Sequence, residues 1–331
     1  MRPHQSLARR AYSAWLTFWF PAPSPRGKLA LLRIGTSLIL LYVLFVRSFD
    51  LQDGLSRAIW SNPVTRQALD PIGWPFTVFH WVDGTWWLWS MHVLAMLVAG
   101  ALLAGVLTPL MAALSLVFQL SYAHSNPAML LGVDGLLILA LAYLSLVPSG
   151  RVLGVFGRVE PDYPQYPPYL AYLQDELPPR PEQGLPWSSL PVRMLQLHLS
   201  ILYLHSGLSK LTTDWLAGTA LWHPRLVALG ALVPLNTLQS VPYLTSLITY
   251  GLVLFELFYC VLVWVRPVRY PMLALAVVVH LSVGIAWGLL PFNLLMIVLN
   301  LAFVPPAHLE SLVRFIRPLL VLPWVANDAR D

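Results

Sequence analysis

The sequence predicts an all-α fold, a polytopic bundle of about eight transmembrane helices, from three observations. Only 11% of the 331 residues are charged, whereas soluble domains carry about 25%. Apolar runs long enough to cross a bilayer recur along the chain. Many of the fourteen tryptophans lie near the ends of these runs, where they anchor helices at the interface. The expected partner is therefore the lipid bilayer, and the loop-borne net charge of +5 does not indicate a nucleic-acid partner.

Several kinds of site are excluded by the residue pattern. The single cysteine, Cys260, allows neither an intramolecular disulfide nor a thiolate metal site. The nine histidines form no HxxxH or HExxH pair, so we expect no bound metal. A Walker loop, a dinucleotide-binding glycine pattern and a GxSxG elbow are also missing from the sequence.

The spans follow from the apolar runs and the residues that interrupt them. We expect a basic interfacial segment over 1–28, a transmembrane domain over 29–305 with a proline-rich inside loop at 149–190, and an amphipathic tail over 306–331. The polar piece at 212–240 is expected to lie on the surface or to re-enter the membrane. Within the domain the predicted spans are about 29–49, 86–107, 109–122, 129–147, 196–215, 241–265, 271–288 and 291–304.

The distribution of basic residues orients these spans. With the N-terminus inside, fourteen of the twenty basic residues fall in inside segments and five in outside segments, while Arg33 lies in the membrane. Both termini are therefore predicted inside, in a multi-pass protein of the inner or plasma membrane. The connector 123–128 and the far end of the fifth span then meet on the outer side.

The fifth span, Gln196 to Trp215, carries the candidate chemistry. The chain has only two lysines, Lys28 and Lys210, and otherwise uses arginine as its basic residue. Arginine keeps its proton in proteins, whereas a desolvated lysine can release it. Lys210 is therefore a candidate base. The alternative is a lysine that snorkels to the interface from a helix end.

Helical spacing places polar and small residues on one face of this span. Gln196, Ser200, Tyr203, Gly207 and Lys210 follow steps of 4, 3, 4 and 3. Such a face looks into a wet cavity or packs closely on a neighbouring helix. His198 and His205 lie well round the helix from Lys210 and are expected in the core or at the lipid interface.

Four ionisable residues are predicted at membrane depth: Arg33, Asp134, Glu256 and His280. Each charge there costs about 2.5–3.5 kcal/mol, so each should be paired or functional. Arg33 could neutralise Asp134 or Glu256 in a structural pair. Glu256 shares a helix face with Thr245 and other polar residues, which suggests a cavity lining. His280 lies above Gly284 and Gly288, where a neighbour or ligand can approach closely.

The run YLHSGLSKLTTDWLAGTAL resembles the segment around the catalytic lysine of the vitamin K-dependent gamma-carboxylases. Four further runs, LLRIGTSL, GVLTPL, HSNPAMLLGVDGLLILALAYLSLVPSG and HLSVGIAWGLLPFNLLM, resemble the wider HTTM family of transmembrane proteins, as does Glu256. The resemblance covers about residues 28–305. The residues that match around the lysine are Gly207, Leu208, Lys210, Leu211, Asp214, Trp215 and Gly218.

The resemblance implies a quinol-driven reaction on the outer side. In the carboxylases a lysine amine deprotonates reduced vitamin K, and the resulting anion reacts with oxygen to form a strong base. That base removes a proton from the gamma-carbon of a glutamyl residue, which then adds carbon dioxide. Here Lys210 would be the base for a reduced vitamin K or menaquinol, with O2 and CO2 as co-substrates and a secreted peptide or protein as the substrate. His124 and Asn126 would orient the base. The residues implied to bind the quinol are Tyr203, Gly207, Trp215, Glu256 and His280.

Departures from the carboxylase pattern leave epoxidation better supported than carboxylation. The sequence has no room for the large lumenal portion of the animal enzymes. Ser209 replaces the first of their paired lysines, and the order His124-Ser125-Asn126 replaces their adjacent Asn-His. Two other functions stay open: a non-catalytic HTTM protein in secreted-peptide maturation or export, and a small-solute transporter using Asp134, Glu256 and His280.

Overall fold

The computed structural model describes residues 26–55, 77–125, 130–155, 189–222 and 239–305, together with positions 15, 18–19, 308–309 and 315. Within these ranges every regular element is a helix, as the sequence predicts. Eight helices have 11 or more residues: α2 (Arg26–Arg47), α6 (Thr85–Ala104), α7 (Thr108–Ser125), α8 (Gly132–Ser145), α10 (Ser189–Ser209), α14 (Pro242–Leu262), α15 (Arg266–Ala286) and α16 (Leu290–Asn300).

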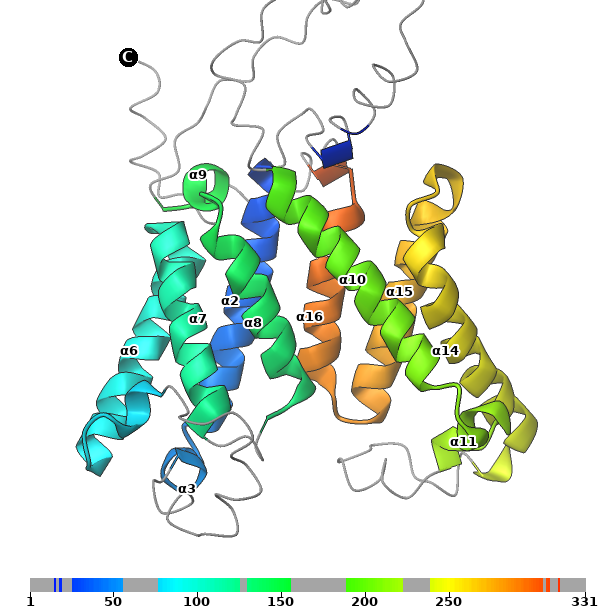
Figure 1. The fold of residues 1–331 in the computed structure, drawn as a ribbon, viewed down its shortest axis with the longest axis horizontal. Coiled ribbons are helices and arrows are strands. Elements are labelled where there is room, and N and C mark those ends of the chain that lie inside the picture. Colours follow the sequence, from blue (N-terminus) through cyan, green and yellow to red (C-terminus); the bar gives the residue numbers. More distant parts are fainter. Residues whose placement is uncertain are drawn as a thin grey trace, which may run out of the picture.

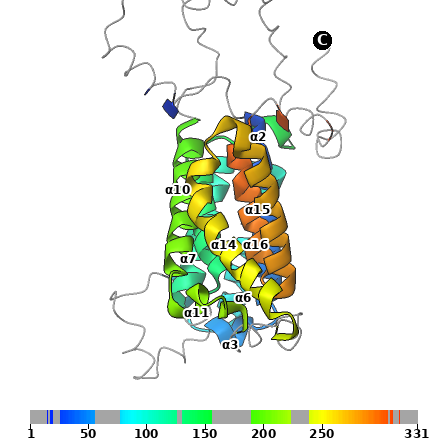
Figure 2. The same cartoon turned by 90° about the vertical axis from the view of Figure 1, so that its right-hand side faces the viewer.

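The long helices run along one common axis, as the two perpendicular views show (Figures 1 and 2). We name the two ends of the bundle after the short helices that mark them in Figure 1, α9 (Gly150–Leu153) at the top and α11 (Thr213–Leu216) at the bottom. The start of α2 and the end of α16 both lie at the α9 end. The remaining short helices are α3 (Leu51–Leu55), η1 (Val78–His80), η5 (Ala220–Trp222) and η6 (Leu301–Phe303).

Four helices are long and apolar enough to cross a membrane by themselves: Gly27–Arg47, Thr85–Ala104, Pro242–Leu262 and Arg266–Ala286. Helices α8 and α16 are apolar but shorter. Large apolar side chains such as Leu97, Leu247 and Val278 are more than half exposed, as on helices that face lipid. The protein is therefore an all-α membrane protein, while the count of eight spans and the side of each terminus remain predictions.

Local sequence sets the helix boundaries. Gly105 has φ +82° and ends α6 in the left-handed conformation that favours glycine. Prolines occupy the first turns of α14, α15 and α16, where the missing N–H leaves no hydrogen bond unmade. Helix α10 begins seven residues earlier than the predicted span and ends at Ser209, so Lys210 lies just beyond the helix.

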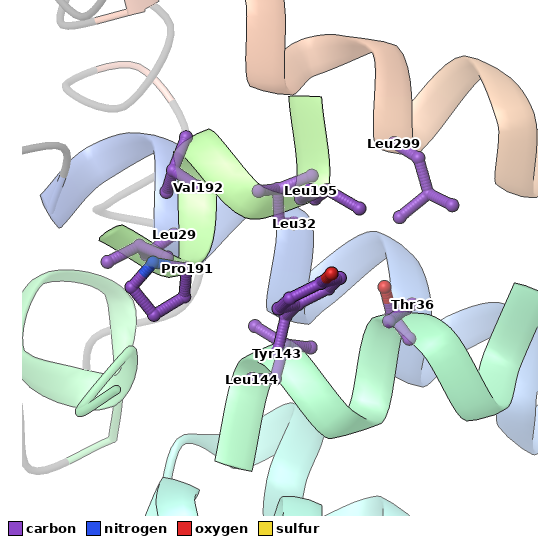
Figure 3. Close-up of a pocket in the computed structure, with 10 residues that line it drawn as sticks. Leu29, Leu32, Thr36, Tyr143, Leu144, Pro191, Val192, Leu195 and Leu299 are labelled. Carbon is purple, nitrogen blue, oxygen red and sulfur yellow. The ribbon is translucent and has the colours of Figure 1, made fainter. Parts of the chain in front are cut away.

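The core forms where α2, α8, α10 and α16 meet in the middle of the bundle (Figure 1). Figure 3 shows this contact: Leu32 from α2, Leu144 from α8, Leu195 from α10 and Leu299 from α16 converge on one void. The void measures about 10 Å³ and its lining is almost entirely apolar, so it offers a water too few polar partners. This close packing holds α8, α10 and α16 in fixed positions, and the same helices line the site described next.

Candidate active site

Lys210 makes an ion pair with Glu256. Its ammonium nitrogen, Nζ, lies 2.6 Å from Glu256 Oε2 and 2.7 Å from the hydroxyl oxygen of Ser206. The same nitrogen lies 5.3 Å from the centre of the Trp215 ring, within reach of a cation–π attraction. The Lys210 and Glu256 side chains are 21% and 16% exposed, so the pair is neither dry nor free in water.

The approach of α10 to α14 brings the two residues together. Gly207 packs directly on the backbone of α14, and a Cβ atom at this position would lie 2.9 Å from the Leu257 nitrogen. Glu256 precedes Leu257, so this contact holds its carboxylate beside the end of α10. The Lys210 amide donates to the Gly207 carbonyl, which turns the chain out of the helix at this point.

A cavity of about 640 Å³ lies beside the ion pair. Ser206 and Glu256, the two side chains that bind the Lys210 ammonium, both line it. Much of the remaining lining is apolar and comes from α8, α10 and α16, with polar groups from α10 and α15. The lining includes Gly132, Gly135, Leu136, Leu139, His198, Leu202, Tyr203, His205, Ser209, His280, Phe292 and Met296.

Tyr203 and His280 belong to a chain of hydrogen bonds beside the cavity. The Tyr203 hydroxyl lies 2.7 Å from His280 Nε2, and His280 Nδ1 lies 2.8 Å from Asn293 Oδ1. Asn300 Nδ2 donates to the Tyr203 hydroxyl over 2.7 Å. The Tyr259 hydroxyl in turn donates to Asn300 Oδ1 over 2.7 Å.

The partners fix the direction of every donor in this chain. Asn293 donates through Nδ2 to the Leu289 carbonyl, so its Oδ1 must accept from His280 Nδ1. A neutral His280 then presents Nε2 as an acceptor, and the Tyr203 hydroxyl donates to it. The tautomer of His280 is therefore set by the protein before any ligand binds.

A second ion pair, Arg47 with Asp134, lies in a buried network towards the α11 end. Arg47 Nη2 and Gln119 Nε2 each donate to Asp134 Oδ1 over 2.7 Å, and the Leu131 amide donates to Oδ2 over 2.9 Å. The Arg47 guanidinium also stacks over the Tyr122 ring at 4.7 Å. Asp134 is fully buried and caps α8, so the network fixes the start of a helix that lines the cavity.

The expected pairing of Arg33 is corrected by this network. Asp134 pairs with Arg47 and Glu256 pairs with Lys210, so neither neutralises Arg33. The fully buried Arg33 instead donates from Nη2 to the Leu153 carbonyl at the α9 end. Arg33 lies in the half of α2 nearest the α9 end, whereas Asp134 lies in the first turn of α8, near the α11 end. The two residues are therefore too far apart along the bundle to pair.

The other predicted site residues fall into two groups. Tyr203, Glu256 and His280 line the cavity, and Gly207 and Trp215 contact the structure around Lys210. His124 lies in the last turn of α7, and the side-chain partners given above for Lys210 are Ser206, Glu256 and Trp215. Asn126 lies outside the described residues.

The prediction missed part of the lining. His198 and His205, expected in the core or at the lipid interface, face the cavity together with Leu202 and Ser209. These four residues follow steps of 4, 3 and 4, so helical spacing alone predicts that they share one face of α10. Asn293 and Asn300 gave no such signal, because their role depends on contacts with α10 and α15.

Comparison with known protein families gives a match over the part of the chain that contains this site. Residues 185–307 match the HTTM domain. This HTTM segment contains Lys210, Glu256 and the whole hydrogen-bonded chain, and over these residues the match agrees with the resemblance seen in the sequence. The match does not extend to the earlier residues that the resemblance included. No curated protein and no solved structure matches the chain significantly.

Proposed function

We propose that this protein is a carboxylase-like membrane enzyme in which Lys210 removes a proton from a reduced quinone of the vitamin K or menaquinol type. The observation that supports the proposal is the position of the Lys210 ammonium. It binds Ser206 and Glu256, and both of these side chains line the cavity. The match of residues 185–307 to the HTTM domain, which is associated with vitamin K-dependent carboxylase-like proteins, points to the same chemistry.

The cavity fits a quinol in size and in chemistry. Small-molecule sites measure about 300–1,000 Å³ and combine apolar walls with a few polar groups, and this cavity measures about 640 Å³. Leu202, Phe292 and Met296 would contact an apolar ring and tail. Glu256 and the Tyr203 hydroxyl would bind the ring oxygens. His280, whose two ring nitrogens bond to Tyr203 and Asn293, would hold Tyr203 in position.

The chain's own residues supply the base. In the proposed reaction the ammonium proton would move to the Glu256 carboxylate across 2.6 Å, and the amine left behind would accept a proton from the quinol. A bound reduced quinone would supply the electrons for epoxidation with O2 and the drive for adding CO2 to a glutamyl residue of a secreted peptide.

The test is an epoxidation assay on the full-length protein in lipid nanodiscs. Reduced vitamin K or menaquinol and oxygen would be supplied, with and without bicarbonate and a glutamyl peptide. We expect Lys210→Ala and Lys210→Arg to lower the epoxidation rate by about 10²–10⁴-fold, as for other lost general bases. Ser90→Ala is the control and should keep the rate, because Ser90 is exposed on α6 and donates to the Trp86 carbonyl of its own helix. Full epoxidation by Lys210→Ala would refute the proposal.

The second candidate is a non-catalytic HTTM membrane protein in secreted-peptide maturation or export. The observation in its favour is that Lys210 already has a carboxylate, a hydroxyl and an aromatic ring as partners, which is sufficient for a structural role. A folded wild-type protein that forms no epoxide under any of these conditions would favour it. The transporter alternative has less support, because Asp134 is locked in the Arg47 network and does not line the cavity.

A further inference from the structure

Three basic side chains from three helices gather at the α9 end of the bundle, opposite Lys210. Lys28 begins α2, Arg193 belongs to the first turns of α10, and Arg269 to the first turn of α15. Shared contacts hold the three together. Arg193 stacks over the Trp264 ring at 5.9 Å, and Arg269 donates to the Trp264 carbonyl. Lys28 donates to the same Ala302 carbonyl as Gln196, the side chain that Arg193 binds. We name Lys28, Arg193 and Arg269 the basic cluster.

The described residues provide no carboxylate for this cluster. The ion pairs found among these residues join Lys210 to Glu256 and Arg47 to Asp134. Lys28, only 5% exposed, donates to the Ala302 carbonyl over 2.8 Å. Arg269 donates to the carbonyls of Val263 and Trp264 at the end of α14. Carbonyl groups satisfy some donors, but they do not neutralise three charges at a membrane end.

Arg193 retains an unmet donor. Its Nη1 donates to Gln196 Oε1 over 2.8 Å, and Gln196 in turn donates to the same Ala302 carbonyl that Lys28 binds. Its Nε is buried and has no hydrogen-bond partner within the described part of the chain. The face of the guanidinium is covered by Phe18, whose ring centre lies 5.0 Å away. The remaining edge is therefore the part of Arg193 that can bind a ligand.

We propose that the basic cluster binds a phosphate group, in which Arg193 and Arg269 contact the phosphate oxygens and the buried Lys28 adds charge behind them. Guanidinium groups bind phosphate through paired hydrogen bonds, and basic pockets between membrane helices bind anionic lipid headgroups. The phosphate can belong to a lipid or be free. A lipid is favoured by the exposed apolar residues that continue along α14 and α15 from this end, among them Val261, Leu275 and Val278.

Native mass spectrometry of the full-length protein tests the proposal. Phosphatidylglycerol, phosphatidylcholine and inorganic phosphate would each be titrated into delipidated protein in neutral detergent. We expect phosphatidylglycerol to be retained, and Arg193→Gln or Arg269→Gln to weaken its retention by about ten-fold, the loss typical of one charge-assisted hydrogen bond. Arg266→Gln is the matched control, because it removes an exposed arginine from the same end and should change retention less than two-fold.

The arms of the titration separate the outcomes. Binding of inorganic phosphate with the same dependence on Arg193 supports the phosphate site and identifies a free anion as its source. Equal retention of phosphatidylcholine and phosphatidylglycerol, or retention that neither arginine variant changes, would overturn the proposal. Should Arg269→Gln fail to fold, since it also caps α14, Arg269→Lys keeps the charge and still loses the paired geometry. The readout is lipid binding, so it is independent of the proposed catalysis.

Discussion

Lys210 and Arg47 hold their carboxylates at nearly the same distance, 2.6 and 2.7 Å, in different surroundings. Asp134 is fully buried and accepts from Arg47, Gln119 and the Leu131 amide, so both its oxygens are bonded. Glu256 is 16% exposed, lines a cavity, and has the Lys210 bond through one oxygen. Asp134 is enclosed by protein although its partner Arg47 is 22% exposed, whereas Glu256 borders space for a ligand.

The difference indicates what each pair can do. A guanidinium keeps its proton, so the Arg47–Asp134 pair is a fixed brace between α2 and α8. An amine, unlike a guanidinium, can release its proton, and the proposed function assigns that role to Lys210. Four substitutions, each compared with a matched variant, test this contrast.

The largest effect is expected from Asp134→Ala. It leaves the buried Gln119 amide and the part-buried Arg47 guanidinium without their acceptor, and each donor left unpaired costs about 1–3 kcal/mol of unfolding free energy. Loss of the monodisperse peak in size-exclusion chromatography after heating would measure it. Glu256→Ala is the matched change in the other pair and should cost about 1 kcal/mol or less because water reaches that site. A greater loss for Glu256→Ala would reverse the contrast.

Gly207→Ala should disturb the Lys210–Glu256 pair, because Gly207 allows the close contact between α10 and α14 that brings the two side chains together. The added Cβ would lie 2.9 Å from the Leu257 nitrogen, so α10 and α14 must separate, at a cost of about 1–3 kcal/mol. The same heating assay measures the cost. Gly251→Ala on α14 is the control, since a Cβ there meets nothing within 4 Å. Equal stability of the two variants would show that the helices do not need this close contact.

Tyr203→Phe removes the hydroxyl that joins His280 to Asn300 beside the cavity. The two buried partners lose a hydrogen bond each, and we expect a loss of about 1–2 kcal/mol in the heating assay. Tyr250→Phe makes the same chemical change at an exposed tyrosine bonded to the Leu216 carbonyl and should have little effect. If both variants unfold at the wild-type temperature, the chain of hydrogen bonds does not stabilise the fold.

The smallest effect on stability should come from Lys210→Arg. It keeps the positive charge beside Glu256, so unfolding free energy should change by about 0.5 kcal/mol or less, although the proposed epoxidation would stop. The reverse substitution, Arg47→Lys, should destabilise more, because it loses the guanidinium stacked over Tyr122. The heating assay compares the stability of the two variants. A larger loss of stability for Lys210→Arg than for Arg47→Lys would contradict this expectation.

The helical class could be predicted, and Lys210 could be identified as a candidate, because both inferences depend on local signals. Apolar runs identify membrane helices, and a lysine in a chain that otherwise uses arginine is visible without a fold. The burial of Gln196, Ser200, Tyr203 and Gly207 also followed from helical spacing, and the structure confirms it. Glu256 was correctly expected to line a cavity.

The pairing of charges could not be predicted, because it depends on which helix ends lie side by side. Lys210 and Glu256 are 46 residues apart, and Arg47 and Asp134 are 87 apart. Arg47 was counted only as an outside-loop charge, so its partner was assigned to Arg33. Spacing along one helix gives a face, whereas a contact between helices requires their order and tilt in the bundle.

The hydrogen-bonded chain beside the cavity is not built to pass protons from one of its ends to the other. Asn293 and Asn300 flank Tyr203 and His280, and an amide donates and accepts hydrogen bonds without releasing its own proton. A proton that reaches His280 therefore has no onward conductor through the helices towards Tyr259. His198, His205 and Glu256 line the cavity outside this chain. We therefore expect a proton taken from a molecule in the cavity to leave through these side chains and not through Asn293 or Asn300.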